Sequence, residues 1–130
     1  MDPWRASAAR PDLAADRTAH TASFGKIARG LTEILAKKLT AYLAGLQNTE
    51  TIDRWASDVE PPAALQDRLR RAYVVAVTLS SIDESSVVQA WFTGLNPELG
   101  DRSPIRLLAE GTDTEAKAVL GAARLFHAAG

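Results

Sequence analysis

The spacing of apolar residues from Phe24 onward constrains the fold of this chain more than any other feature. Apolar side chains recur there at steps of three and four residues, the period of one helical face: Phe24, Ile27, Leu31, Ile34, Leu35, Leu39, Tyr42 and Leu46. The Tyr73–Val77 run finds no alternating segment elsewhere to pair with as a strand, so we interpret it as a buried helix. The chain is therefore predicted to be all-α, with about six or seven helices.

Proline and polar residues predict the boundaries of the first helices. We expect the first apolar stretch to break near Leu39–Thr40. A short helix then spans Thr49–Ser57, with Ile52 and Trp55 turned inward. The Glu60–Pro62 segment starts the next helix, because proline fits only a first turn. This long helix is predicted to be the spine of the fold, with the core stripe Leu65, Leu69, Ala72, Tyr73, Ala76 and Leu79.

A turn that contains glycine, asparagine and proline follows the next predicted helix. That helix opens at Ser81 or Asp83 and brings together Val87, Val88, Trp91, Phe92 and Leu95. Gly94 is expected to take left-handed backbone where the helix stops, and Asn96–Pro97 to form the turn. Ser103 is the expected N-cap of the following helix, with Pro104 at its first position.

Two helices are predicted to close the chain. The first spans Ser103–Glu110 and ends at Gly111. The second begins with a capping box, because Glu115 follows Thr112 by three residues. Its predicted inner face consists of Ala116, Val119, Leu120, Ala123 and Phe126.

Composition favours a small cytoplasmic protein. The 130 residues suffice for one compact unit, or for two very small units that share an interface. A hydrophobic content of 46% with 24% charged residues is ordinary for a soluble protein, and no apolar run is long enough to span a membrane. The chain has no cysteine, and its first residues lack the apolar core of a secretion signal.

The first 23 residues show no helical or strand period, and we interpret them as a flexible arm. Trp4 either docks on a partner from this arm or belongs to an unremarkable tail. Charge is uneven in the rest of the chain, with a net of +2 over residues 24–80 and −3 over residues 81–130. A basic middle suits nucleic acid and an acidic end suits a basic partner, although imbalances this small also arise by chance.

The Trp91–Pro104 segment has the pattern W-F-x-G-x-N-P-x-L-x-x-x-S-P, followed by a short helix, Gly111 and a last helix. This arrangement resembles the toxin-binding domain of the Xre/MbcA/ParS family of antitoxins. The upstream Leu39–Ala56 segment resembles the helix-turn-helix that precedes this domain in the family, with Ile52 and Trp55 as buried anchors. The resemblance implies a helix-turn-helix-like region over residues 24–80 and a toxin-binding helical domain over residues 81–130.

This resemblance implies an antitoxin of a type II toxin–antitoxin pair that also represses its own operon. The expected partner is a cognate toxin, of the RES-domain type that consumes NAD. The toxin would be bound by the end of the last helix, at Arg124, Leu125, Phe126, His127, Ala128, Ala129 and Gly130. An alternative remains open, in which Leu125 and Phe126 complete this protein's own core and the tip frays.

The resemblance also implies a homodimer that binds operator DNA. Its contacts would come from Asn48, Thr49, Glu50, Thr51 and Arg54, flanked by Lys37 and Lys38. Glu50 and Asp53 place two negative charges on the expected reading helix, so phosphate attraction there is small. A helix-turn-helix that serves only for packing is therefore an equal alternative.

Residues able to make or break bonds are scarce. The only histidines are His20 and His127, and neither has a neighbouring nucleophile or metal-ligand pattern. We therefore expect neither an enzyme, nor a bound cofactor, nor a metal site. Two alternatives to the antitoxin remain, a free-standing helix-turn-helix transcriptional regulator without a toxin partner, and a structural interaction module.

Overall fold

The computed structural model describes residues 11–55, 57 and 59–129, and these residues fold almost entirely into helices. Seven α-helices and one 3-10 helix are present in this part of the chain. They are α2 Pro11–Thr21, α3 Phe24–Ala44, α4 Glu50–Trp55, α5 Ala63–Ser80, α6 Ser85–Thr93, η1 Pro97–Leu99, α7 Pro104–Glu110 and α8 Asp113–Ala129. The all-α prediction is confirmed, and Tyr73–Val77 lies within α5 rather than in a strand.

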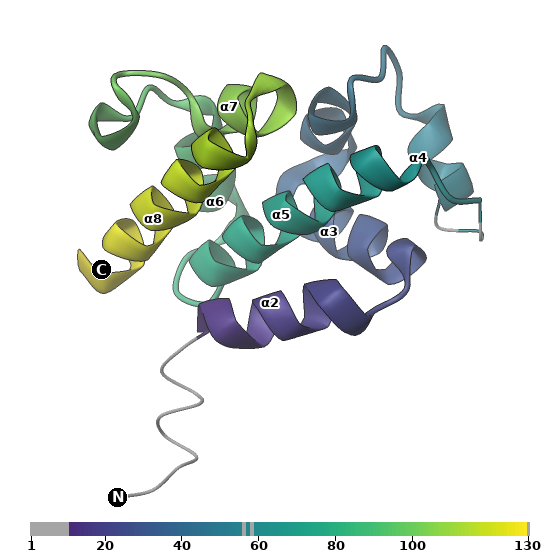
Figure 1. Cartoon of the computed structure of the whole chain (residues 1–130), viewed down its shortest axis with the longest axis horizontal. Coiled ribbons are helices and arrows are strands. Elements are labelled where there is room, and N and C mark those ends of the chain that lie inside the picture. Colours follow the sequence, from purple (N-terminus) through teal and green to yellow (C-terminus); the bar gives the residue numbers. More distant parts are fainter. Residues whose placement is uncertain (1–10, 56, 58, 130) are drawn as a thin grey trace, which may run out of the picture.

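Helix α5 is the spine of the fold, as its long apolar stripe predicts. It crosses the middle of the molecule, with α2 along one side, α8 along the other and α3 behind it (Figure 1). Its buried residues lie on more than one face of the helix: Leu69, Ala72, Val74, Val75, Ala76, Thr78 and Leu79. Because helices pack on several sides of α5, its second half is buried nearly all round.

One continuous apolar core joins the two regions that the sequence separates near residue 80. Phe24 and Trp55 contribute to it from the first region and pack edge to face, with ring centroids 5.5 Å apart. Phe92, Leu108 and Val119 contribute to the same cluster from the second region. Ile52 and Trp55 of α4 are both buried, as predicted.

Helix α2 contradicts the expectation that residues 1–23 form an arm without helical structure. Ala15 and Ala19 lie one turn apart and are buried against Val74 of α5. Alanine side chains are too small to mark an apolar stripe, so the sequence carries only a weak helical period there. Residues 1–10, including Trp4, lie outside the described residues, and the two suggestions for Trp4 concern that part of the chain.

Arg70 of α5 holds the C-terminal end of α2. Its Nη1 donates hydrogen bonds to the carbonyl oxygens of Ala19 at 2.6 Å and Ala22 at 2.9 Å. The last carbonyls of a helix have no donor within the helix, and the negative end of the helix dipole favours a cation there. A polar tether therefore supplements the small apolar contact between α2 and α5.

Helix α3 bends at Ala36, and not near Leu39–Thr40 as the sequence predicts. Ala36 has φ 68° and ψ 166°, a conformation that crowds any side chain with a Cβ atom. Two side chains bind carbonyl oxygens at the bend. Gln89 Nε2 of α6 donates to the Ile34 oxygen at 3.0 Å, and Thr40 Oγ1 donates to the Ala36 oxygen at 2.9 Å. A residue of a distant helix thus binds α3 beside the bend, and local spacing does not reveal this contact.

The turn after α6 forms as expected but with a different glycine in left-handed backbone. Gly94 has φ −76° and ψ 161°, so the prediction of a left-handed Gly94 is wrong. Gly100 and Asp101 are left-handed instead, with φ 65° and φ 59°. Asn96 does form the turn, because its Oδ1 accepts a hydrogen bond from the Glu98 backbone N–H at 2.9 Å. The chain therefore reverses at the end of η1 and not at the end of α6.

The last two helices begin at the predicted cap residues, but the side chains of these residues form different hydrogen bonds from those predicted. Ser103 is the N-cap of α7 and Pro104 follows it, but the Ser103 side chain makes no capping hydrogen bond. Glu115 Oε1 accepts a hydrogen bond from the Thr112 backbone N–H at 3.1 Å, which is half of the predicted capping box. The Thr112 hydroxyl bonds to the same carboxylate at 3.4 Å instead of to a backbone N–H.

Candidate protein-binding surface

Large apolar side chains are exposed mainly at one end of the molecule. The first turn of α2, the α5–α6 loop, α6 and the last turns of α8 come together there (Figure 1). Of the eight large hydrophobic side chains that are exposed in the described part of the chain, six lie in these segments or just after the end of α6. We call them, together with the half-buried Trp91, the apolar end: Leu13, Ile82, Val87, Trp91, Leu95, Leu125 and Phe126.

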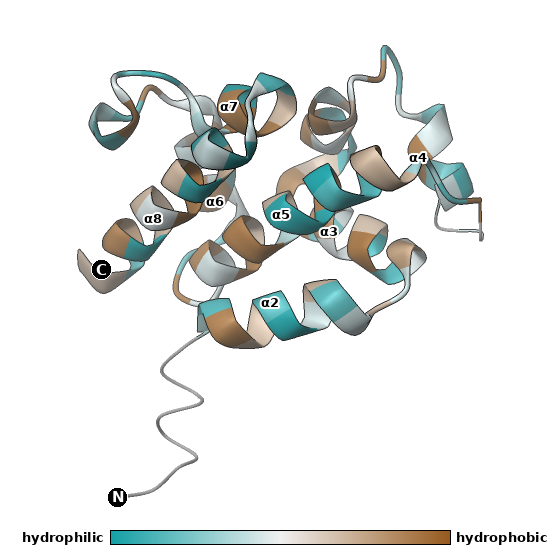
Figure 2. Ribbon diagram, viewed as in Figure 1, coloured by the Kyte–Doolittle hydropathy of each residue, from teal (hydrophilic) through white to brown (hydrophobic). Residues whose placement is uncertain are grey.

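The apolar character of these segments is visible on the ribbon. Figure 2 shows hydrophobic colouring at the start of α2, in the α5–α6 loop and near the end of α8. Leu95 is the most exposed member, with 75% of its surface accessible, and Leu125 follows with 58%. Single exposed apolar residues are normal on a protein surface, but several on adjoining segments mark an interaction site.

Three aromatic rings link this surface to the core. Phe92 is fully buried, and the Trp91 ring packs on it edge to face with centroids 5.6 Å apart. The other neighbour of Trp91 is Phe126 of α8, with centroids 6.3 Å apart and an angle of 55° between the ring planes. Phe92 thus anchors Trp91 from below, while Phe126 remains 39% exposed beside it. A rigid aromatic pair of this kind is typical of binding hot spots.

The predicted toxin-binding residues lie in the last turns of α8 and differ in exposure. Leu125 is 58% exposed, whereas Phe126 is 39% exposed and lies against the Trp91 ring at the edge of the core. His127 is half-buried, while Ala128 and Ala129 are exposed. Gly130 lies outside the described residues.

Arg124 has a role within the chain that the sequence does not predict. Its Nε donates to Asp12 Oδ2 of α2 at 2.8 Å, whereas the sequence analysis placed Arg124 only among the expected toxin-binding residues. The Asp12 side chain is only 5% exposed, so it needs such a counter-charge. This ion pair joins the two termini of the described chain beside the apolar end. Because the Asp12–Arg124 pair holds the first turn of α2 beside α8, the neighbouring Leu13 lies near the apolar end. The sequence analysis did not predict this, since it did not predict α2.

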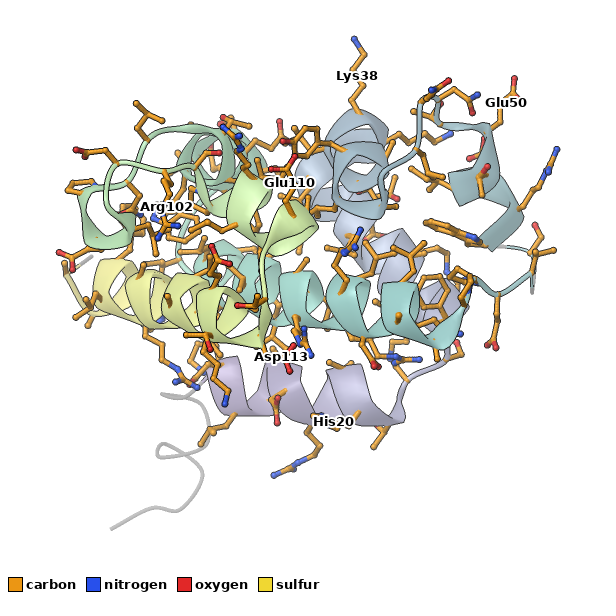
Figure 3. All side chains as sticks on the ribbon, turned by 45° about the horizontal axis from the view of Figure 1, so that its top comes forward. His20, Lys38, Glu50, Arg102, Glu110 and Asp113 are labelled. Atoms are coloured by element: carbon orange, nitrogen blue, oxygen red, sulfur yellow. The ribbon has the colours of Figure 1, made fainter. Side chains whose placement is uncertain are left out.

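The predicted DNA-binding residues lie away from the apolar end, on α3, α4 and the turn between them. Lys38 and Glu50 project outward on this side of the molecule (Figure 3). Asn48 Oδ1 accepts a hydrogen bond from the Glu50 backbone N–H at 3.1 Å, so Asn48 acts as a local cap. Arg54 is exposed on α4, while Thr49 and Thr51 are half-buried.

An ion pair reduces the positive charge near α4. Lys37 Nζ lies 2.8 Å from Asp53 Oδ1, and both side chains are about half exposed. Lys37 is therefore less available to a phosphate than its sequence position suggests. The pair joins α3 to α4, and nothing in the local sequence around either residue predicts it.

The described residues hold no group of three histidine, cysteine, aspartate or glutamate side chains placed to bind a metal. His20 points away from the molecule, and its Nδ1 lies 2.8 Å from the Asp16 carbonyl oxygen (Figure 3). A hollow of about 520 Å³ lies beside it, between α2 and α5, and its charged lining residues are Asp16, His20, Asp67, Arg70 and Arg71. Elsewhere, Glu110 accepts a hydrogen bond from Arg106 and raises the pKa of that guanidinium above its ordinary value.

No helix in the described part of the chain combines the length and apolar character needed to cross a membrane. No family model, curated protein or solved structure matches this chain.

Proposed function

We propose that this protein is an antitoxin that neutralises a cognate toxin by binding it through the apolar end. The observation that carries this proposal is the concentration of exposed apolar side chains around Trp91 and Phe126. The Trp91–Pro104 motif, which resembles the toxin-binding domain of Xre/MbcA/ParS antitoxins, supplies one side of the same surface. The two independent arguments thus point to the same region of the molecule.

The mechanism is occlusion rather than chemistry. Trp91 and Phe126 form a preorganised aromatic anchor, and Leu95 and Leu125 add flexible apolar area beside it. Side chains of this kind lose little conformational entropy on binding and bury a large area. We propose that the last turns of α8 cover the active site of a toxin of the RES-domain, NAD-consuming type. In this proposal the complex forms in the cytoplasm.

A second activity, repression of the operon, is proposed for the region of Lys37 to Arg54. It is supported by the exposed polar side chains of Asn48, Glu50 and Arg54, and by Lys38 nearby. A homodimer would present two copies of this region to a symmetric operator. If this activity is present without a toxin partner, the protein is a free-standing regulator, which is the second candidate function.

Co-expression with the product of the adjoining gene tests the antitoxin proposal. That product should arrest growth when expressed alone, and the chain should relieve the arrest and co-purify with it at fixed stoichiometry. Phe126→Ala should weaken the complex at least about tenfold, in the range of an interface hot spot. Tyr42→Ala is a matched control, because Tyr42 is an aromatic of similar exposure, 46%, outside the apolar end. A harmless neighbour, or equal effects of the two variants, would refute the proposal.

A further inference from the structure

The three arginines of residues 81–130, which are Arg102, Arg106 and Arg124, are all engaged in ion pairs within the chain. Arg102 Nη1 lies 3.2 Å from Glu115 Oε2, and Arg106 Nε lies 3.0 Å from Glu110 Oε2. Arg124 is paired with Asp12, as described above. These pairs neutralise most of the positive charge that this half of the molecule carries.

Four carboxylates near α6 form no ion pair with a described residue. Asp83 and Glu84 directly precede the first residue of α6, and Glu98 and Asp101 lie in the connection that follows it. Within residues 11–55, 57 and 59–129, none of the four has a cation at ion-pair distance. Negative charge therefore flanks α6 before its start and after its end.

The exposed apolar side chains of α6 lie between these two acidic pairs. Val87 and Trp91 are one turn apart on α6, and Leu95 follows the end of the helix. The rise of an α-helix places Glu84 and the end of α6 roughly 15 Å apart. The surface thus has an apolar centre on α6, with acidic residues before the start of the helix and after its end.

From this arrangement we infer that the partner of the apolar end is a protein surface with an apolar centre and lysine or arginine residues on both sides of it. An amphipathic helix with basic residues near both of its ends has this chemistry. The inference rests on the proposed function, since it describes the surface of the protein that the apolar end binds. Acidic borders attract such a partner at long range, and the apolar centre holds it at contact.

The same charges disfavour other occupants. A second copy of this chain would bring two sets of the same four carboxylates together, which is repulsive in a symmetric contact. Nucleic acid and anionic lipid surfaces are repelled for the same reason. A basic protein surface is the occupant that complements both the apolar centre and its borders.

Two synthetic peptides test this inference on the full-length chain. Each is a 15-residue amphipathic helix with leucine and phenylalanine on one face; one carries lysines near both ends, and the other carries glutamates there. Fluorescence anisotropy should detect binding of the lysine peptide, weakening at least about tenfold from about 50 to about 300 mM NaCl because salt screens the attraction. The glutamate peptide should bind at least about tenfold more weakly.

Charge-reversal variants then locate the effect. The double variant Glu84→Lys, Glu98→Lys should invert the preference between the two peptides. Glu33→Lys, which changes an exposed carboxylate of α3, should leave the preference unchanged. Circular dichroism confirms that the variants are folded. Equal affinity for the two peptides, no binding of either, or an equal effect of Glu33→Lys would overturn the inference, as would self-association of the free chain that Phe126→Ala abolishes.

The two proposals fail in different ways. If the adjoining gene product does not bind while the lysine peptide is preferred, the antitoxin proposal fails and the inferred chemistry of the surface stands. If the adjoining product binds but its association rate is insensitive to salt and to the Glu84→Lys, Glu98→Lys change, the antitoxin proposal stands and this inference fails.

Discussion

Helices α4 and α6 differ in how many of their apolar side chains are buried. In α4 both large apolar residues, Ile52 and Trp55, are buried, and the exposed positions are polar or charged. In α6 Val88 and Phe92 are equally well buried, yet Val87 and the neighbouring Leu95 are exposed. The core accounts fully for the apolar residues of α4 but only for half of those around α6. The exposed remainder belongs to the surface for which we propose a protein partner, and α4 has no such remainder.

Replacing Phe92 and Phe126 by alanine should give the largest difference in the free energy of unfolding. Both rings contact Trp91, but Phe92 is fully buried and Phe126 is not. Phe92→Ala should lower the free energy of unfolding by about 3–5 kcal/mol, because it leaves a cavity in the core. Phe126→Ala should lower it less, by about 1–2 kcal/mol, since the ring is 39% exposed and only its contact with Trp91 and neighbouring surface is lost. Urea denaturation measures both, and similar losses would show that Phe126 belongs to the core.

The tether between α2 and α8 should have the next largest effect. Arg124→Ala removes the guanidinium bonded to the buried Asp12 carboxylate, and should cost about 1–3 kcal/mol of stability. Hydrogen exchange should also speed up in α2. Arg106→Ala is a suitable control, because its pair with Glu110 is exposed to solvent and contributes little to stability. Equal effects of the two substitutions would contradict this account of Asp12.

Glycine should stabilise the protein at the bend in α3 and destabilise it elsewhere in the same helix. Ala36 has positive φ, where a Cβ atom is strained, so Ala36→Gly should raise the free energy of unfolding by about 1 kcal/mol. The same change in a regular part of α3, Ala28→Gly, should lower stability by about 1 kcal/mol or more, since Ala28 is buried within the helix. Thermal unfolding compares the two variants. Destabilisation by both would mean that α3 is regular at residue 36.

The exposed pair between α3 and α4 should have the smallest effect. Lys37→Ala should change stability by less than about 1 kcal/mol, because both partners are half exposed. If the region of Lys37 to Arg54 binds operator DNA, Lys38→Ala should reduce the salt dependence of that binding more than Lys37→Ala does. A gel-shift titration at several salt concentrations measures this difference. The reverse order would show that Lys37 leaves Asp53 to contact phosphate.

Features set by local spacing were accessible from the sequence. The all-α class, the long buried α5 and the inward positions of Ile52 and Trp55 follow from apolar period and proline placement. Features set by distant contacts were not. Beside the bend at Ala36, the Ile34 carbonyl oxygen accepts a hydrogen bond from Gln89, fifty-five residues away along the chain. Helix α2 depends on alanine contacts with α5, which leave almost no signal in a single sequence.

The candidate surface was only partly predictable for the same reason. The motif around Trp91 and the end of α8 indicated two of its segments, and both lie at the apolar end. Leu13 and Ile82 joined it only through the fold, because they lie on α2 and on the α5–α6 loop. Arg124 was assigned to the partner because its real neighbour, Asp12, is 112 residues away along the chain.

Hydrogen–deuterium exchange of the chain, with and without the product of the adjoining gene, tests the central claim most directly. The account predicts slower exchange on binding in α6, in the Gly94–Arg102 connection and in the last turns of α8, with α4 unchanged. Protection confined to α3 and α4, with α6 and α8 unaffected, would contradict it.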